Sequence, residues 1–548
     1  MTALGRWQRI APAAGLAALA ALPLVWALFH AAGAGIDPSA WAALQREPQL
    51  ARAWGTTLFT GLAATLLSLA LSAWILSRSF PGPAWTRALS WLPPMLATPH
   101  ASFAIGLAFL IAPSGWILRL LSPWATGFDA PPPWPTTQDP WGLGLVAVLV
   151  AKEVPFLLWT AAGQLQRPDV GVRLGRELNV ALSLGYSPQR AWWRIVWPQL
   201  APRLAPPALA VLAYSLTVVD MALVIGPTSP PALAVLAWQW LLDADPAVNA
   251  VGAVAAWTLA ATVAVVAGVA WLLARLATKW HGAPSGKRGR PASPRLRPFA
   301  LAVLPVLYVC VLLALAVGSV AGVWPFPELW PQRPSLQAWR SVGSSIGTVG
   351  VTLSLGFAAG ATALAWSVAW LESASPAWDS RLRQLLYLPL MLPSVLWVVG
   401  LHRLTLAWGL DARWPGLWLA HSLAALPYAL IALSPAYLGF DQRYGQVTAS
   451  LGRGRTAFLL RVKWPLLKAA LGGAFAVSFA VSVAQYLPTV FIGAGRFNTV
   501  TTEAVTLASG AQRSLTAAYA WLQWLLPAAV FALAAWFGRP RRFHRSAA

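Results

Sequence analysis

Long apolar segments recur along the whole chain, and they constrain its fold more than any other feature. Of the 548 residues, 58% are hydrophobic and 10% are charged, against about 25% charged residues in an ordinary soluble domain. Runs of roughly 20 apolar residues, the length that crosses a bilayer as a helix, follow one another through both halves of the sequence. Stretches such as Leu143–Val150 and Phe299–Val317 lack the apolar–polar alternation of membrane β-strands. The sequence therefore predicts an all-α polytopic membrane protein.

About 12 transmembrane helices are expected from these runs. The predicted spans are Ile10–Ala32, Trp54–Leu76, Leu89–Ile111, Trp141–Gly163, Pro206–Ile225, Val251–Leu273, Phe299–Val320, Val342–Leu371, Leu385–Trp408, Trp414–Leu433, Ala469–Ile492 and Leu515–Phe537. A signal peptide is the alternative for the first run, because small residues follow it. Its apolar length exceeds the usual signal core, so we predict an uncleaved helix that begins in the cytoplasm behind Arg6 and Arg9.

The chain divides into two halves of six spans each. Residues 1–275 form the first half, 276–298 a basic cytoplasmic linker and 299–548 the second half. Within the linker, Gly282–Lys287 superficially resembles a phosphate-binding loop, but its spacing is one residue short and Arg288 replaces the required Ser or Thr. No nucleotide site is therefore predicted. The two halves read as tandem six-helix bundles, and the first contains an additional proline-rich exterior segment between 112 and 140.

The net charge of +23 follows the predicted topology and does not indicate nucleic-acid binding. Most Lys and Arg residues fall in the segments that share one side of the membrane, which is the positive-inside pattern of cytoplasmic loops. Anionic lipid headgroups attract such loops as well. The chain contains one cysteine, Cys310, inside an apolar run, and we interpret it as a packing residue. We therefore expect the lipid bilayer, and no nucleic acid, as a partner of these charges.

Two basic stretches between predicted spans share one pattern. Each reads Ser-Leu-Gly, has a β-branched residue ten positions after the glycine, and ends in Trp-Pro. The matching pairs are Gly185 with Gly452, Ile195 with Val462, Trp197 with Trp464 and Pro198 with Pro465. Ser187 and Pro188 favour the start of a short helix, with the serine as its cap. An interfacial helix that anchors the loop to lipid is the alternative, but it does not require the same glycine-to-proline spacing twice. The repeat therefore favours a docking element in each half.

These stretches resemble the loop signature of ABC importer permeases: Glu-Ala-Ala, three residues, Gly, nine residues, a β-branched residue, one residue and Leu-Pro. Ala181 matches the second alanine in the first copy, where the second copy has Thr448. The acidic position holds Asn179 and Gln446 instead, which puts the acid-mediated contacts of the family in doubt but leaves the helix–turn geometry intact. The resemblance covers essentially the whole chain.

The resemblance implies that the loops 164–205 and 434–468 each carry a coupling helix, at Leu184–Trp192 and Leu451–Leu459, that sits in a groove of a separate ATP-binding subunit. The residues implied for this coupling are Gly185, Tyr186, Arg190, Ile195, Pro198, Gly452, Arg453, Arg455, Val462 and Pro465. It also implies a dimer of ATP-binding subunits, a periplasmic solute-binding protein, a bacterial inner-membrane location with both termini in the cytoplasm, no cofactor, and transport by alternating access. The chain itself is then a permease and not an enzyme.

The fused twelve-span layout resembles the branch with ferric-iron and thiamine permeases. Met221–Thr228 and Gln485–Phe497 look most like thiamine permeases, and ferric iron, sulfate or polyamine stay open as cargo. The alternative class is an ion-gradient-driven secondary transporter, which would need coupling carboxylates or broken helices in matching places of both halves. Asp220 has no acidic counterpart in the second half, and this weakens the alternative.

The fifth span of each half lines the pathway in this family, and polar residues there are the candidates for a pathway or gate. They are Asp220, Tyr214, Gln485 and Tyr486. A carboxylate near mid-membrane costs about 2.5–3.5 kcal/mol on insertion scales, so Asp220 should face a cavity or a partner; a wet position at the exterior end of its helix is the alternative. Local pairing is expected for Lys152 with Glu153. His100, His402 and His421 lack metal-ligand spacing, and we predict structural roles and no metal site.

Overall fold

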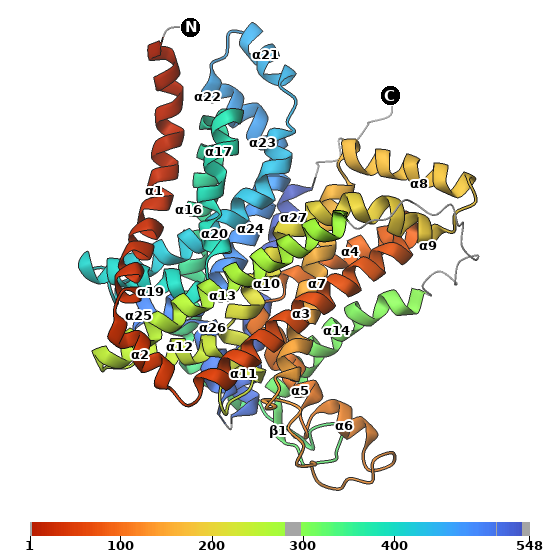
Figure 1. Cartoon of the computed structure of the whole chain (residues 1–548), viewed down its shortest axis with the longest axis vertical. Helices are drawn as coiled ribbons and strands as arrows, with labels where there is room; N and C mark the ends of the chain where they lie inside the picture. The colour runs from red at the N-terminus through yellow and green to blue at the C-terminus, as the bar shows by residue number, and fades with distance from the viewer. Residues whose placement is uncertain (1–2, 280–297, 511, 540–548) are drawn as a thin grey trace.

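The computed structural model describes residues 3–279, 298–510 and 512–539, and these residues are almost entirely helical (Figure 1). The elements of the first half are α1 (Ala3–Gly35), α2 (Pro38–Arg46), α3 (Leu50–Ser79), α4 (Pro83–Ala97), α5 (His100–Ile111), α6 (Trp116–Leu121), α7 (Leu143–Leu165), η1 (Pro168–Val172), α8 (Arg173–Ser183), α9 (Pro188–Ala191), η2 (Trp192–Val196), α10 (Trp197–Thr217), α11 (Asp220–Ile225), α12 (Leu233–Leu241) and α13 (Pro246–Lys279). Those of the second half are α14 (Pro298–Ser319), β1 (Ala321–Val323), β2 (Arg333–Pro334), α15 (Gln337–Ser344), α16 (Ile346–Ser373), α17 (Pro376–Leu386), α18 (Leu388–Met391), α19 (Ser394–Ala407), α20 (Trp414–Leu438), α21 (Arg443–Ser450), α22 (Arg455–Phe458), η3 (Leu459–Lys463), α23 (Trp464–Leu466), α24 (Lys468–Ala484), α25 (Leu487–Gly493), α26 (Val500–Ala508) and α27 (Arg513–Gly538).

Within the described residues, 8 helices are long and apolar enough to cross a membrane. The number rises to 9 if α24 and the segment Arg455–Leu466 before it, which meet at 76°, count as one span. The prediction of an all-α polytopic membrane protein is confirmed. The predicted linker 276–298 lies largely outside the described residues, as does the chain after Arg539.

The third and fifth predicted spans of each half are not the continuous helices that the sequence suggested, and Val342–Leu371 begins in α15 before it continues as α16. Leu89–Ile111 is divided between α4 and α5. Its counterpart Leu385–Trp408 is divided between α18 and α19. The two fifth spans are divided as well, between α10 and α11 and between α24 and α25. Thr98 and Leu392 each precede a proline, which disfavours helical backbone at the residue before it. The breaks therefore fall at equivalent places in the two halves.

The helix that follows the fifth span is attached in the same way in both halves, by a hydrogen bond from its first residues to a threonine of the second span. The backbone N–H of Leu233 at the start of α12 donates to Thr57 Oγ1 of α3, at 2.9 Å. In the second half the N–H of Val500 at the start of α26 donates to Thr352 Oγ1 of α16, also at 2.9 Å. Each threonine satisfies an N-terminal amide that has no partner inside its own helix. The duplication thus extends from sequence motifs to individual contacts.

The first helix of each half packs against the other half. Helix α1 lies along α16, α17 and α19 of the second half, whereas α14 lies along α4 and α5 of the first (Figure 1). Gly400 of α19 allows the closest approach, because a Cβ there would lie within 2.5 Å of the Ala27 backbone. The buried apolar core accordingly mixes residues of both halves, including Leu24, Val311 and Val398.

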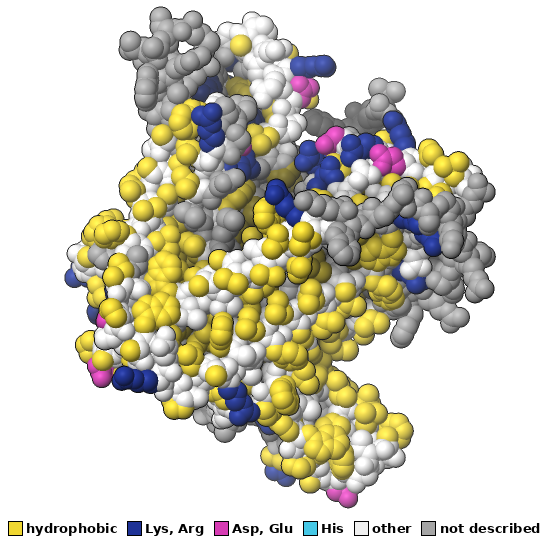
Figure 2. All heavy atoms as spheres, in the orientation of Figure 1, with side chains coloured by type: hydrophobic (Ala, Val, Ile, Leu, Met, Phe, Trp, Pro, Cys, Tyr) yellow, Lys and Arg dark blue, Asp and Glu magenta, His cyan; other side chains and the backbone are white. Residues whose placement is uncertain are grey.

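The two motif-bearing segments, α8–α9 and α21–α22, lie at one end of the molecule, which we call the loop end (Figure 1). Helix α6 and strand β1 lie at the opposite end. Between the two ends, hydrophobic side chains cover the flank formed by α3, α10 and α13, whereas Lys and Arg gather around α8 and α9 (Figure 2). This distribution is that of a bundle that crosses a bilayer from end to end.

Candidate functional site

The two basic loops have the same backbone structure. In the first, the N–H groups of Leu184, Gly185 and Tyr186 donate to the carbonyls of Val180, Leu182 and Ala181. In the second, Leu451, Gly452 and Arg453 donate to Val447, Ala449 and Thr448. Gly185 and Gly452 have φ values of 86° and 70°, a left-handed conformation that glycine adopts at little cost. The predicted helix–turn geometry is therefore present in both copies, without the acid of the family motif.

The downstream parts of the loops match as well. Helices α9 and α22 form short single turns, and each continues into a π-helical turn, η2 or η3, that ends at the Trp-Pro pair. Pro188 begins α9 as predicted, but Ser187 caps it without a side-chain hydrogen bond. Ala181 and Thr448, at the small-residue position of the motif, are both buried. Small side chains there let α8 and α21 pack against the rest of their loops.

Each loop also exposes a pair of aliphatic side chains that sequence reasoning did not single out. Val180 and Leu184 are 59% and 55% exposed, and their equivalents Val447 and Leu451 are 58% and 72% exposed. The members of a pair are four residues apart, hence on one face of the helix end. Their signal in the sequence was the repetition of the same apolar pair between charged residues at equivalent places.

The structure places the predicted coupling residues at different depths in these loops. Gly185, Pro198, Gly452, Arg453, Arg455 and Pro465 are exposed, and Tyr186, Arg190, Ile195 and Val462 are half-buried. The guanidinium of Arg194 lies 5.9 Å from the centre of the Tyr186 ring. At the start of the first loop, Arg167 donates to the Asp169 carboxylate at 3.0 Å, and this hydrogen bond lowers the pKa of that carboxyl.

The second loop is held by an ionic cluster that the first loop lacks. Glu372, at the loop end of α16, accepts hydrogen bonds from Arg455 (2.8 Å), Tyr437 (2.8 Å) and Lys463. In the first loop, Glu177 instead accepts from Gln199 at 2.6 Å, within the loop itself, and Trp192, Trp193 and Trp197 pack together. The predicted coupling residue Arg455 is therefore engaged on one side by the helix bundle.

We expect Glu372→Gln to weaken the attachment of the second loop by about 1–3 kcal/mol, because it removes the charge that Lys463 and Tyr437 face in a partly buried setting. Arg455 is 69% exposed, so its share is small. The unfolding midpoint in detergent measures the effect. Glu177→Gln in the first loop is the matched control and should cost less than about 1 kcal/mol; an equal loss in both variants would contradict the role assigned to Glu372.

The four predicted pathway residues lie at or near the breaks in the two fifth spans. Asp220 begins α11, Tyr214 lies near the end of α10, and Tyr486 lies between α24 and α25, with its ring 6.2 Å from that of Trp238, centroid to centroid. The Gln485 side chain donates to Val481 O of α24 at 3.2 Å. Asp220 is half-buried between the two halves.

The expected local pairing of Lys152 with Glu153 takes the form of an electrostatic interaction between neighbouring charges and not of a direct ion pair. Both side chains are buried, but no direct ion pair joins them. Lys152 Nζ instead donates to the carbonyls of Met95 and Thr98, at 3.2 and 2.6 Å, at the break between α4 and α5. The Met95 carbonyl also accepts from the N–H of Thr98. Adjacent residues of a helix point in different directions, which is why Glu153 faces a different set of side chains.

The histidines have structural contacts, as predicted. His421 of α20 is fully buried and bridges Ser482 of α24 and Thr489 of α25, at 2.9 and 3.1 Å, across the second break. His402 pairs with Asp411 at 3.0 Å, and His100 packs against the Tyr214 ring. The described residues contain no group of three or more His, Cys, Asp or Glu side chains that could hold a metal ion.

A buried polar chain joins the two halves near the same break. Ser102 of α5 donates to Gln523 of α27 at 2.5 Å, Gln523 donates to Thr501 at 2.7 Å, and Thr501 donates to the carbonyl of Val483. Ser102, Thr501 and Gln523 are all fully buried. Each polar atom of the chain is satisfied by the next, so the break in α24–α25 is supported from the first half.

The comparisons with known proteins agree with this architecture. No family model matches the chain. The inner membrane ABC transporter permease protein YnjC of Escherichia coli is 34% identical over 526 residues, which are 95% of this chain and 95% of the relative. The chain belongs to the ABC transporter permease family.

A thiamine transport system permease protein, ThiP, of Brucella suis is 27% identical over 39% of this permease and 41% of its own length. A spermidine/putrescine transport system permease protein, PotC, of Haemophilus influenzae is 26% identical over 20% of this permease and 42% of its own length. These relatives are transport permeases and not enzymes, as was predicted for this chain.

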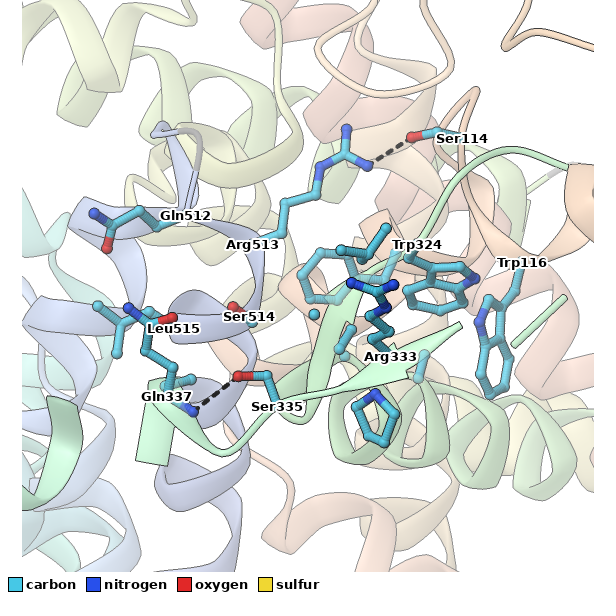
Figure 3. Close-up of a pocket in the computed structure, with 18 of the residues that line it drawn as sticks. Ser114, Trp116, Trp324, Arg333, Ser335, Gln337, Gln512, Arg513, Ser514 and Leu515 are labelled. Atoms are coloured by element: carbon cyan, nitrogen blue, oxygen red, sulfur yellow. Dashed lines mark hydrogen bonds between the residues drawn. The ribbon is translucent and has the colours of Figure 1, made fainter. Parts of the chain in front are cut away.

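At the end opposite the loops, the permease has a polar cavity of about 830 Å³ between segments of the two halves (Figure 3). Arg513 of α27 reaches across it to Ser114 of the first half, at 2.6 Å. Arg333 and Trp324 lie on its wall. Next to them, the buried Arg119 donates to the carbonyls of Trp324, Pro325 and Glu328, so the additional exterior segment of the first half is tied to the second.

Proposed function

We propose that the chain is the membrane subunit of an ATP-driven importer that moves a small solute to the cytoplasm by alternating access. The observation that carries the proposal is the pair of loops with identical backbone hydrogen bonds and identical exposed aliphatic pairs at one end of the bundle. Two loops of the same structure suit two equivalent grooves, and these grooves would belong to a dimer of ATP-binding subunits. The two six-span segments 1–275 and 299–548 would then rock against each other about the central side chains.

The rest of the proposal concerns location, delivery and cargo. We place the chain in a bacterial inner membrane, with the loop end and both termini in the cytoplasm, in agreement with the basic residues there. The polar cavity at the opposite end is where a periplasmic solute-binding protein would hand over the solute. Thiamine-like compounds or ferric iron are the proposed cargo. The resemblance of the fused layout to ferric-iron and thiamine permeases supports both, and a relative named as a thiamine transport permease supports the first.

A secondary transporter driven by an ion gradient is the second candidate, and one observation favours it. The breaks in the third and fifth spans occur at matching places of both halves, as in secondary carriers with internal repeats. Asp220 has no acidic equivalent in the second half, however, and the repeated loops have no role in such a carrier. The loops therefore favour ATP-driven import.

Charge reversal in the loops tests the proposal. We expect Arg190→Glu combined with Arg453→Glu to lower uptake at least about tenfold, because the proposed partner has to accept these basic side chains. Uptake of labelled thiamine by cells that express the permease with its neighbouring transport genes is the measurement. Arg46→Glu, at an exposed position of α2 away from the polar cavity, is the control. Uptake that persists in the double variant, or that runs on an ion gradient after ATP depletion, would overturn the proposal in favour of the secondary carrier.

A further inference from the structure

We infer that a phospholipid with a net negative charge binds at the end of the permease opposite the loops. Its headgroup lies in the polar cavity, against Arg333 and Arg513, and one of its acyl chains lies in an apolar groove between α6 and α14. The inference goes beyond the proposed function, because it requires neither a transported solute nor an ATP-binding subunit.

The polar cavity carries positive charge. Three arginines line its wall, Arg119, Arg333 and Arg513, and no described residue of the wall is acidic. Ser335 and Ser514 add hydroxyl groups to the same wall. A guanidinium suits a phosphate group, because its N–H groups can donate two parallel hydrogen bonds to the phosphate oxygens. The cavity therefore favours an anionic phosphate group over a cation.

The three arginines differ in how far the protein already engages them. Arg119 is 6% exposed and its hydrogen bonds go to backbone carbonyls, so it holds the wall together. Arg513 is exposed and donates to Ser114 Oγ at 2.6 Å. Arg333 of β2 is exposed as well, and its guanidinium has no hydrogen bond or ion pair with another described residue. Arg333 is thus the principal cation for a phosphate, with Arg513 as the second.

An apolar groove of about 530 Å³ meets the cavity at Trp116. The groove lies between α6 and α14, and its described lining consists of hydrophobic side chains and Cys310. Trp116, the first residue of α6, belongs to the lining of both spaces. Its ring lies 6.2 Å from that of Trp324 in the cavity wall and 5.5 Å from that of Trp330 in the groove, centroid to centroid (Figure 3). A basic space and an apolar space that meet at one ring match a molecule with a charged head and a hydrocarbon chain.

The groove opens onto a surface that faces lipid. Val303 and Val306 of α14 are 57% and 54% exposed, and α14 is one of the helices apolar enough to cross a membrane. On the other wall, Ile117 and Leu120 of α6 are 48% and 58% exposed. Trp330 is 60% exposed, and tryptophan favours the headgroup level of a bilayer. The groove therefore lies where acyl chains meet headgroups.

The combination of the two spaces selects the occupant. A free phosphate would pair with the arginines but leave the apolar groove uncovered. A lipid without net charge would cover the groove but leave the positive charge of the cavity unbalanced. An anionic phospholipid satisfies both requirements, because apolar burial and charge pairing then act on the same molecule. Since Trp116 belongs to the first half and Arg333 and Arg513 to the second, the bound lipid contacts both halves.

Photocrosslinking of the full chain in nanodiscs tests the inference. The discs consist of phosphatidylcholine with a small fraction of a lipid that carries a diazirine in one acyl chain, under a phosphatidylglycerol or a phosphatidylcholine headgroup. Peptide mass spectrometry gives the label on α6 and residues 302–310, divided by the label on α13, whose exposed Val265 and Val269 report ordinary lipid contact. We expect this ratio to be at least about fivefold higher for the phosphatidylglycerol probe, because basic residues near the membrane surface attract anionic headgroups.

Three variants separate the headgroup site from the chain site. Arg333→Gln should remove most of the preference for phosphatidylglycerol, and Arg513→Gln is the second headgroup variant if Arg333→Gln elutes as an aggregate. Val306→Trp fills the groove and should lower the label that the phosphatidylglycerol probe leaves on α6. Arg46→Gln, on the exposed surface of α2 and outside the cavity wall, is the control and should leave the preference unchanged.

Equal ratios for the two probes, a preference that survives the loss of the headgroup arginine, or unchanged labelling of α6 in Val306→Trp would overturn the inference. Excess glycerol phosphate at matched ionic strength distinguishes a lipid from a free anion. It should leave the labelling unchanged, and displacement of the probe would show that the cavity binds soluble phosphate esters and would overturn the lipid as occupant. The uptake experiment tests the proposed function separately.

Discussion

Leu184→Asp together with Leu451→Asp is expected to abolish copurification of the ATP-binding subunit and ATP-dependent uptake. Both leucines are more than half exposed at the tips of the two loops, so the substitutions should leave the fold of the permease intact. A carboxylate placed in a dry apolar groove loses its hydration without compensation. A truncated hot spot costs about 2 kcal/mol or more, and two such losses correspond to at least about 1,000-fold weaker binding.

Leu336→Asp provides the matched control for this experiment. Leu336 is 60% exposed but precedes α15 at the opposite end of the bundle, where no ATP-binding subunit is proposed to dock. The control should copurify with the ATP-binding subunit as the unmodified permease does. If the double variant also retained the subunit at unmodified affinity, the twin aliphatic pairs would have no role in docking.

Lys152→Met is expected to have the largest effect on stability, a loss of about 3–5 kcal/mol, because it removes one charge from a buried environment and leaves the other without compensation. It also removes the donor to the Thr98 carbonyl, and one of the two donors to the Met95 carbonyl, at the break between α4 and α5. Unfolding of the purified permease by increasing dodecyl sulfate in mixed micelles, followed by far-UV circular dichroism, measures the loss.

Two further variants separate the causes of that loss. In Lys152→Met with Glu153→Gln, the buried negative charge is gone, and we expect about half of the lost stability to return while the Thr98 carbonyl stays without its lysine donor. Lys468→Met removes an exposed lysine that also donates to a carbonyl, that of Arg539 at 3.0 Å, and it should cost less than about 1 kcal/mol. A loss for Lys152→Met no larger than that of Lys468→Met would show that the break does not depend on this ammonium group.

The sequence was most informative where geometry depends on local chemistry. Glycine at a left-handed position and proline after a loop have few alternatives, so Gly185 and Gly452 predicted the turns correctly. The breaks at Thr98 and Leu392 could have been predicted too, since each precedes a proline. The break at Val218–Val219 could not, because neither residue interrupts a helix; it is visible only in the three-dimensional structure.

Side-chain partners across the bundle were beyond reach of the sequence. Lys152 and Glu153 are neighbours in the chain, and only the position of α4 shows that the lysine serves carbonyls of another helix. The same limit applies to Glu372, whose partners lie in segments distant along the chain. Asp220, Tyr214, Gln485 and Tyr486 were predicted together because the repeat aligns their spans.

Helices α1 and α14 each pack against the opposite half, and this has a consequence for the synthesis and membrane insertion of the protein. When α1 leaves the ribosome, α16, α17 and α19, against which it packs, have not yet been synthesised. Until most of the chain has been inserted, α1 therefore has only α13 of its own half as a neighbour, and lipid covers the face that later contacts the second half. A truncated translation product that ends after the first half would leave α1 without its second-half neighbours and the α4–α5 surface without α14. Quality-control proteases of the membrane would then find two unpacked surfaces on such a fragment, and only completion of the second half closes both.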